Sequence, residues 1–202
     1  SKSSKPGGIK RDHAPFVGNG PGAIALNRIN TAPVGRRERA INDQDIFQVL
    51  DLAQAVSLPS DRDILHTLPQ EYLVDTLDEI KDPTGMFGRR LEGRVHLITA
   101  ARTAMSNLVR CVEELGISVD GLVFQPLASA LAALEKDEME LGVTLVEIGS
   151  STTNIAVYHA GSVRHSAVIP IGSASITNDI AVMLQVSINE AEAIKMKYAS
   201  AK

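Results

Sequence analysis

The sequence has very few aromatic residues and a single cysteine. It contains no tryptophan, and aromatic residues make up 3% of its 202 residues. Proteins that bind single-stranded nucleic acid stack bases on aromatic side chains, and most nucleic-acid-binding surfaces attract phosphates with positive charge. The net charge of −4 gives no such attraction. Neither composition nor charge therefore favours nucleic-acid binding.

Cysteine content and the lack of long apolar runs narrow the class of protein further. One cysteine, Cys111, cannot form a disulfide within the chain, which fits a reducing cytoplasm. Because Cys111 lies in an apolar, helix-like segment, we expect a buried core thiol rather than a nucleophile. No apolar run approaches the roughly 18 residues that a membrane span needs, and no signal peptide is visible. A hydrophobic content of 44% predicts a packed core in one large or two small domains.

The most informative stretch covers residues 143–158. Two apolar runs rich in β-branched residues, Val143–Ile148 and 155–158, flank a turn of glycine, serine and threonine. This pattern predicts two strands and a tight turn whose backbone can approach a ligand and whose hydroxyl and N–H groups can surround an anion. An ordinary β-hairpin with a polar loop explains this stretch equally well when it is taken alone.

The residues that follow extend this pattern. Residues 164–171 predict a third strand, joined to the second by the glycine-containing loop 159–162. Residues 175–185 and 187–198 have helical periodicity, and Ser187 and Glu190 have the spacing of a capping box. We therefore expect a three-stranded meander followed by two helices.

The first 142 residues predict a second unit. Residues 1–22, rich in Ser, Lys, Gly and Pro, are expected to be a flexible lead-in. An α+β unit is expected over residues 42–124, with a first helix capped at Asn42 and a second helix that ends at Gly116. The strands expected within it are residues 64–68, 72–74, 91–99 and 119–124. Outside it we expect a short strand at 23–26, a polar turn at 27–39 and a helix at 127–136.

Several polar residues are candidates for a site. His66 and His96 lie in apolar strands with no metal-ligand partner nearby, which indicates structural histidines. The acid-rich run at 135–140 is expected to be a solvated helix end. Pro126 fits a first helical turn, so Gln125 lies where a strand meets a helix, and a simple capping role is one interpretation of it.

Seven segments carry a family resemblance. They read L-P-Q-E-Y-L-V-D, D-P-T-G-M-F-G-R-R-L-E, V-H-L-I-T, P-L-A-S-A, D-E-M-E-L-G-V, V-R-H-S-A-V-I-P-I-G and A-E-A-I-K-M-K-Y-A. In this order they resemble the FtsA family of actin-like bacterial cell-division proteins, over about residues 24–202. The resemblance implies an α/β and α+β fold class: a partial actin-like ATPase (ribonuclease H-like) fold with an inserted SHS2-type subdomain.

The same resemblance divides the chain into five parts. After the flexible segment 1–22 come a remnant of actin-like subdomain 1A at 23–41 and an SHS2 (1C-like) interaction subdomain at 42–124. The return helix of subdomain 1A follows at 125–142, and part of subdomain 2A, with the phosphate-2 loop, at 143–202. The family's first phosphate loop, Gly-Gly adenosine motif, FtsZ-binding subdomain 2B and C-terminal membrane anchor are missing from the sequence, so we expect a fragment or a truncated relative.

The resemblance also implies a site for ATP with Mg. Gln125 would position the attacking water, and Glu192 and Lys195, which alone would be an ordinary surface ion pair, would contact ribose and adenine. The phosphates would lie against Gly149, Ser150, Ser151, Thr152 and Thr153. The family's turn usually reads D-I-G-G-G-T-T-D. Here Glu147 and Asn154 replace its two aspartates, and Ser150 and Ser151 replace two of its glycines.

These departures weaken the implied site. A serine is strained where φ must be positive. Glu147 carries its carboxylate one methylene further than aspartate, which would disturb a Mg-bound water, so we expect a poor metal ligand. ATP binding is therefore expected to be weak or absent in this chain, and hydrolysis inefficient.

The resemblance implies a scaffold rather than an enzyme. Such a protein would self-associate as an actin-like polymer and recruit FtsZ and later division proteins, with ATP as a structural ligand or switch. It would work in the cytoplasm, at the inner face of the cell membrane at the division site. Met86, Phe87, Arg89 and Arg90 are candidate interface residues, since interfaces favour Met, aromatic residues and Arg; burial of Met86 and Phe87 is the alternative. An actin-fold ATPase or kinase, and a pilus-assembly relative, are the alternative functions.

Overall fold

The computed structural model describes residues 13–18, 23–35 and 38–200. Its strands are β1 His13–Gly18, β2 Ile24–Pro33, β3 Arg39–Ala40, β4 Arg62–Val74, β5 Leu77–Ile80, β6 Phe87–Gly88, β7 Arg90–Ala101, β8 Ser118–Phe124, β9 Val143–Ile148, β10 Thr153–His159 and β11 Ser162–Ile169. Its helices are α1 Asp43–Gln54, α2 Arg102–Glu113, α3 Gln125–Ala133, α4 Lys136–Leu141, α5 Ser173–Leu184 and α6 Ile188–Tyr198.

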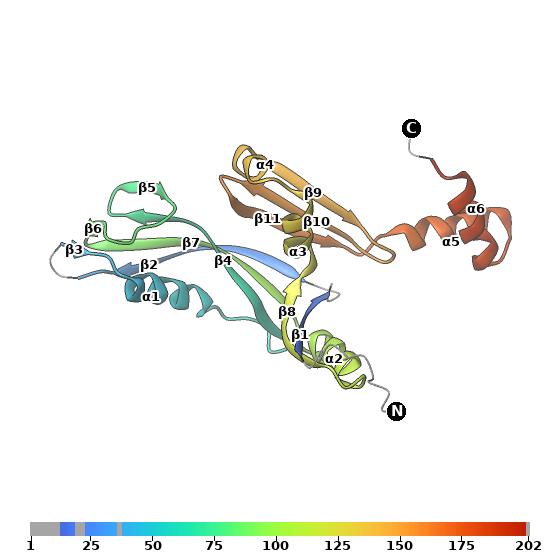
Figure 1. The fold of residues 1–202 in the computed structure, drawn as a ribbon, viewed down its shortest axis with the longest axis horizontal. Coiled ribbons are helices and arrows are strands. Elements are labelled where there is room, and N and C mark those ends of the chain that lie inside the picture. Colours follow the sequence, from blue (N-terminus) through green and yellow to red (C-terminus); the bar gives the residue numbers. More distant parts are fainter. Residues whose placement is uncertain (1–12, 19–22, 36–37, 201–202) are drawn as a thin grey trace, which may run out of the picture.

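Two antiparallel sheets dominate the fold (Figure 1). The first, called the insert sheet, has the strand order β2-β7-β4-β5, and α1 lies along it. The second, called the meander, has the order β11-β10-β9 and is contacted by α3. Helices α5 and α6 extend beyond the meander, away from the insert sheet (Figure 1). The predicted order of strands followed by two helices is therefore present in the second half of the chain.

The insert sheet and α1 enclose an apolar core. Val49 and Ala53 on α1 have no exposed surface and pack with sheet residues such as Leu91 and Leu97, which are equally buried. Gly93 allows this close approach, since a Cβ there would lie 3.2 Å from Cγ1 of Val49. Burial of side chains of this size contributes about 1.5–3 kcal/mol each, so the insert has its own source of stability.

The start of α1 has the predicted cap. The Asn42 side chain accepts hydrogen bonds from the N–H groups of Gln44 and Asp45, and the Asp45 carboxylate accepts one from the N–H of Asn42. Arg39 donates two further hydrogen bonds to Asp45, at 2.6 and 2.7 Å. Reciprocal bonds of this kind satisfy N–H groups that a helix start otherwise leaves without partners.

Residues 24–33 form one long edge strand, not the short strand and polar turn expected from the sequence. Strand β2 pairs with β7 along its whole length, from Ile24 opposite Thr99 to Pro33 opposite Arg90. Only Ala32 of its ten residues is buried, so the strand lacks apolar alternation. Strand β2 therefore belongs to the insert sheet, which begins near residue 24 rather than at residue 42.

The far boundary of the insert also differs from the prediction. Strand β8 pairs in parallel with β1, from His13 opposite Ser118 to Gly18 opposite Phe124, and is not part of the insert sheet. The insert thus ends near Ala101, not at Phe124. Residues 13–18 are a strand rather than part of a flexible lead-in, while residues 1–12 and 19–22 of that segment lie outside the described residues.

Two prolines lie in or near these elements. Strand β4 runs through Pro69 as one strand, where two were predicted, and its pairing with β7 shifts register between Pro69 and Glu71. Proline has no N–H for the ladder, which explains an irregularity at this point. Helix α1 ends at Gln54, before Pro59.

Helix α2 does not bury the apolar stripe that its sequence predicts. None of its residues is buried, and Cys111 is exposed. Its main contacts within the described part of the chain are with β7 and β8, and much of its surface faces outward. The expectation of a buried thiol is therefore wrong.

The two histidines in strands have structural roles, as predicted. His96 is 1% exposed, its Nδ1 lies 2.6 Å from Oδ1 of Asn27, and its Nε2 lies 2.9 Å from Oγ of Ser166. Burial, assisted by nearby His165, lowers the pKa of His96 to about 4, which keeps the ring neutral. His66 accepts a hydrogen bond from the N–H of Phe124, and burial lowers its pKa as well.

Polar contacts join the insert sheet to the meander. The carboxylate of Glu71, on β4, accepts hydrogen bonds from Arg94 of β7 at 2.5 Å and from Arg164 of β11 at 2.8 Å. Burial alone would raise the pKa of Glu71, but the two arginines outweigh it and the pKa is lowered. Gln70 donates to the carbonyl oxygen of Val163 at 2.7 Å. The single negative charge of Glu71 is thus shared by Arg94 of the same sheet and Arg164 of the meander, and the pair with Arg164 connects the two sheets.

None of the helices in the described part of the chain has the length and apolarity that crossing a bilayer requires.

Candidate functional site

The small-residue turn between β9 and β10 is closed by its own backbone. The N–H of Gly149 donates to the carbonyl oxygen of Thr152 at 2.9 Å. A Cβ at position 149 would lie 3.1 Å from that same oxygen, which explains why glycine stands there. Ser150 and Ser151 are not among the residues with positive φ, so the strain expected of serine at these two positions is absent.

The turn packs against the start of α5. The N–H groups of Ser173 and Ala174 donate to the carbonyl oxygens of Gly149 and Ser150, both at 2.9 Å. Gly172 makes this possible, because a Cβ there would lie 2.4 Å from the Ser150 carbonyl oxygen. These two N–H groups of the helix start are therefore bound to the protein itself, whereas a helix start usually offers such groups to an anion.

An open cavity lies outside this contact. It has a volume of about 500 Å³ and is lined by Ser150, Ser151, Ala174, Ser175, Asn178 and Asp179. The lining contains hydroxyl groups and an amide that can donate hydrogen bonds, and one carboxylate that cannot. The cavity can admit a phosphate-sized group, although one acid faces it.

Helix α6 is tied to α5 by a polar cluster around Lys195. The Lys195 ammonium lies 2.7 Å from the Glu192 carboxylate, 2.8 Å from Oγ1 of Thr177 and 3.4 Å from the carbonyl oxygen of Ser173. Thr177 donates to Glu192 at 2.6 Å. The hydrogen bond from Lys195, and then that from Thr177, lower the pKa of Glu192. Glu192 and Lys195 are therefore more than a solvated surface pair, since the Lys195 side chain is only 12% exposed.

A second polar cluster surrounds Glu147 at the end of β9. Gln125, the first residue of α3, lies with its Nε2 3.5 Å from Oε1 of Glu147. Ser129, one turn further along α3, donates its hydroxyl to the same oxygen. Asn154 on β10 lies with its Nδ2 3.5 Å from Oε2. The two residues that the sequence singled out here, Gln125 and Glu147, are thus in contact.

The candidate nucleotide-binding residues lie along one continuous path. Gln125 contacts Glu147, two residues before Gly149; Gly149 is bonded to Ser173, and Ser173 to Lys195. Ser129 and Thr177 complete the two clusters but were missed by the sequence analysis. A serine or threonine within a helix gives no sign of its tertiary partner, so no pattern identified them. Whether ATP binds along this path remains a prediction.

A metal ion has no preformed cage among the described residues, because no group of three or more His, Cys, Asp or Glu side chains converges there. Mg²⁺ is commonly held by one or two carboxylates together with phosphates and water, and Glu147 offers one carboxylate. The donor set therefore fits a water-mediated contact at most, and the role of Glu147 toward Mg²⁺ stays a prediction.

The candidate interface residues lie at the opposite end of the molecule. They belong to β6, β7 and the turn before them, far from α5 and α6 (Figure 1). Phe87 is 67% exposed, which excludes the alternative of burial, while Met86 packs partly on the insert core. Arg89 and Arg90 are exposed, and their backbone N–H groups donate to the Asp75 carboxylate.

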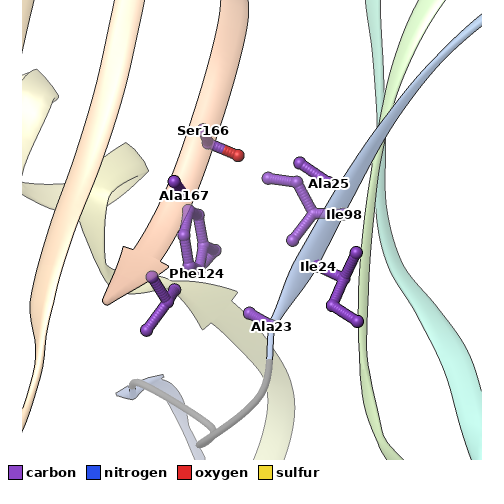
Figure 2. A pocket seen from close by; sticks show the side chains of 8 residues that line it. Ala23, Ile24, Ala25, Ile98, Phe124, Ser166 and Ala167 are labelled. Atoms are coloured by element: carbon purple, nitrogen blue, oxygen red, sulfur yellow. The ribbon is translucent and has the colours of Figure 1, made fainter. Parts of the chain in front are cut away.

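Between the two sheets lies a narrow apolar space. Figure 2 shows Phe124 and Ile98 facing each other across it, with Ser166 and Ala167 on β11. The space has no room for a water-sized molecule. It is a packing contact between the insert and the meander rather than a ligand site.

Comparisons with known proteins identify two regions of the chain, the insert sheet and the C-terminal part that contains the meander, α5 and α6. A family model described as "SHS2 domain inserted in FTSA" matches residues 25–99, which is close to the extent of the insert sheet. A second model, "Cell division protein FtsA", matches residues 144–202. The predicted 42–124 boundaries of the SHS2-type unit are shifted relative to this match.

Curated relatives carry the same description. The chain is 46% identical over 195 residues to the cell division protein FtsA of Pseudomonas aeruginosa, covering 95% of this chain and 46% of that protein. It is 43% identical over 162 residues to FtsA of Bacillus subtilis, covering 80% and 37% respectively. With FtsA of Escherichia coli it shares 39% identity over 175 residues, covering 87% and 41%. The chain thus spans less than half the length of these relatives.

A solved structure shares the fold. The PilM-PilN type IV pilus biogenesis complex aligns with a TM-score of 0.56 and 16% sequence identity, covering 86% of this chain and 48% of that chain. This likeness concerns the fold alone, and it supports the predicted actin-like α/β architecture with an SHS2-type insert. Identity to the division proteins is far higher than to the pilus protein. The chain belongs to the FtsA family of cell-division proteins.

Proposed function

We propose that this chain is the part of an actin-like cell-division scaffold that responds to nucleotide and binds partners. In this role ATP is a structural ligand or switch rather than a substrate that is turned over. Self-association and recruitment of septal ring proteins, FtsZ among them, are its work. The cytoplasmic face of the membrane at the division site is where it acts.

One observation carries the nucleotide part of the proposal. The turn at residues 149–152, the start of α5 and Lys195 on α6 are connected by consecutive hydrogen bonds. A ligand that touches the turn and Lys195 together would therefore fix the position of α6 relative to the meander. Fixing one element relative to another is what a ligand-dependent scaffold requires.

The partner-binding part rests on the insert. Ile24 and Thr99, near its two ends, face each other in the β2–β7 ladder. An insertion whose ends meet in this way can be added to a fold without disturbing it. Its far end exposes Phe87 beside Arg89 and Arg90, side chains that are enriched at protein interfaces.

An actin-fold ATPase is the second candidate function. Gln125 at the start of α3 favours it, since an amide can position a water. Glu147 and Asn154 argue against it, because they stand where the family's turn carries two aspartates, and Asn154 has lost the charge. We therefore retain the scaffold as the leading proposal.

The test uses a full-length protein that contains this chain. Lys195→Ala should raise the Mg-ATP concentration needed for self-association in a sedimentation assay about tenfold, the effect of losing one hydrogen bond to a charged group. Lys197→Ala is the matched control, since Lys197 lies in the same helix but is exposed, with its Nζ 5.0 Å from the centroid of the Tyr198 ring. Self-association that ignores Mg-ATP, or that responds equally to both substitutions, would contradict the proposal.

A further inference from the structure

The carboxylate of Glu147 is surrounded by neutral hydrogen-bond donors. Oε1 accepts from Ser129 and from Gln125, whose Nε2 lies 3.5 Å away, and Oε2 lies 3.5 Å from Nδ2 of Asn154. Gln125 and Ser129 are four residues apart in α3 and therefore share one face of the helix. Both oxygens of one side chain are thus held by residues of two other elements.

This arrangement determines which way the Gln125 amide points. An ionised carboxylate can only accept hydrogen bonds, so it attracts the NH₂ group of a neighbouring amide and repels its oxygen. Because Nε2 of Gln125 faces Glu147, its Oε1 faces the other way. The reversed amide would place two acceptors against each other.

We propose that Ser129 is a positioning residue that holds the Glu147 carboxylate in place, and that this carboxylate fixes the Gln125 amide with its oxygen free to accept a hydrogen bond from a water at the turn. The role of Glu147 in this inference is to orient an amide, not to bind a metal ion. It rests on the proposed function, because the water in question matters only if nucleotide phosphates lie at the turn.

Asn154 gives independent support. It is 1% exposed, and its Oδ1 is buried without a hydrogen-bond partner. Leaving a buried acceptor without a partner costs about 1–3 kcal/mol. The reversed amide would place its oxygen against the Glu147 carboxylate, so the carboxylate holds the NH₂ group toward itself although Oδ1 stays without a partner. Glu147 thus fixes the orientation of two amides, on β10 and on α3.

The test is a nuclear magnetic resonance measurement on the whole chain labelled with ¹⁵N. The side-chain amide signal of Gln125 is identified by its loss in the variant Gln125→Glu. In the parent protein we expect the signal of a rigid, hydrogen-bonded amide. In Ser129→Ala we expect it to move to the position of a solvent-exposed glutamine and to lose its rigidity, while Ser129→Thr, which keeps the hydroxyl, retains the parent signal.

A matched control separates positioning from general loss of stability. Ser162→Ala removes a hydroxyl that donates to the carbonyl oxygen of Gln70 at 3.0 Å, far along β11 from the turn, and should leave the Gln125 signal unchanged. If Ser129→Ala does not fold, Ser129→Cys replaces the hydroxyl by a weak donor of similar size and should give the same change. An unchanged Gln125 signal in Ser129→Ala or Ser129→Cys, or an equal change in Ser162→Ala, overturns the proposal.

A titration distinguishes this inference from the proposed function. Addition of a non-hydrolysable ATP analogue with Mg²⁺ should shift the Gln125 signal further in the parent protein. The effect of Ser129 is measured without nucleotide, so it decides the positioning role by itself. Absence of a further shift would count against the nucleotide site, not against the contact between Ser129, Glu147 and Gln125.

Discussion

The insert and the α5–α6 pair bury their apolar side chains to very different extents. Val49, Val95 and Leu97 in the insert have no exposed surface. On α5 and α6, by contrast, Met183 is 82% and Met196 is 77% exposed. The insert is stabilised by an apolar core of its own, whereas the two helices bury only the small residues Thr177, Ala181 and Ala191 and are joined by the polar cluster around Lys195.

This difference separates two kinds of surface. An element with a closed core needs no further contact, so the exposed Phe87 at the end of the insert is available to a partner. The large apolar side chains on α5 and α6 form a surface of the kind that another protein segment usually covers. We therefore expect the insert to tolerate separation from its surroundings, and the α5–α6 pair to depend on contacts beyond itself.

Removal of the insert should have the largest effect. In a full-length protein, replacing residues 24–101 by a short Gly-Ser linker should abolish self-association or recruitment of later division proteins, because the interaction surface is lost. Thermal unfolding of the remaining domains should stay cooperative, since the ends of the insert are adjacent in the β2–β7 ladder. Normal assembly and recruitment in this deletion variant would show that the insert is not the interaction module.

A pair of core and surface substitutions tests the difference in burial directly. Leu97→Ala, in the insert core, should lower the free energy of unfolding by about 2–5 kcal/mol. Met183→Ala, on the exposed side of α5, should change it by less than about 0.5 kcal/mol. Chemical denaturation of the 202-residue chain measures both. Similar losses for the two variants would mean that α5 is covered in solution, for example by a second copy.

Much of this architecture could be predicted from sequence because its signals are local. The cap at Asn42, the capping box of Ser187 and Glu190, and the two strands around the turn all depend on residues within four positions of each other. Periodicity and cap chemistry describe such elements before any tertiary contact forms. The structural role expected of the two histidines agrees with the hydrogen bonds that both make within the protein.

The errors concern partners that are distant in the chain. Strand β2 is a polar edge strand, and its assignment depends on pairing with β7, more than fifty residues away. The same holds for β1 and β8. In the candidate site, Ser129 and Thr177 have an ordinary helical context, and only the folded chain shows that they bind Glu147 and Glu192. Local patterns carry no information on such contacts.

At the start of α1 we expect a smaller effect on the free energy of unfolding, and one that depends on pH. The hydrogen bond from Arg39 is the main reason why the pKa of Asp45 is lowered, and the N–H of Asn42 adds to it. A lowered pKa means that Asp45 stabilises the fold above its unfolded pKa of about 3.9, and that this stabilisation is lost as the pH falls through the folded pKa. Asp45→Asn should therefore cost about 1–2 kcal/mol at pH 7 and progressively less below pH 4.

Asp43→Asn is the control for this prediction. Asp43 lies in the same first helical turn and is exposed, so its replacement should cost only a few tenths of a kcal/mol through the helix dipole. Urea denaturation at a series of pH values measures both variants. If the loss of unfolding free energy in Asp45→Asn did not change with pH, the role assigned to the ionised carboxylate would be contradicted.

The smallest effect is expected from Mg-ATP on the 202-residue chain itself. Ser173 and Ala174 at the start of α5, and Gly149 in the turn, use their N–H groups for bonds within the protein. The remaining cavity is open and has the Asp179 carboxylate in its lining, which repels phosphate. Calorimetric titration should therefore give a dissociation constant above 1 μM, a binding free energy weaker than about −8 kcal/mol. Sub-micromolar affinity would show that the turn and Lys195 suffice for a nucleotide site, and that α5 and its neighbours rearrange to build it.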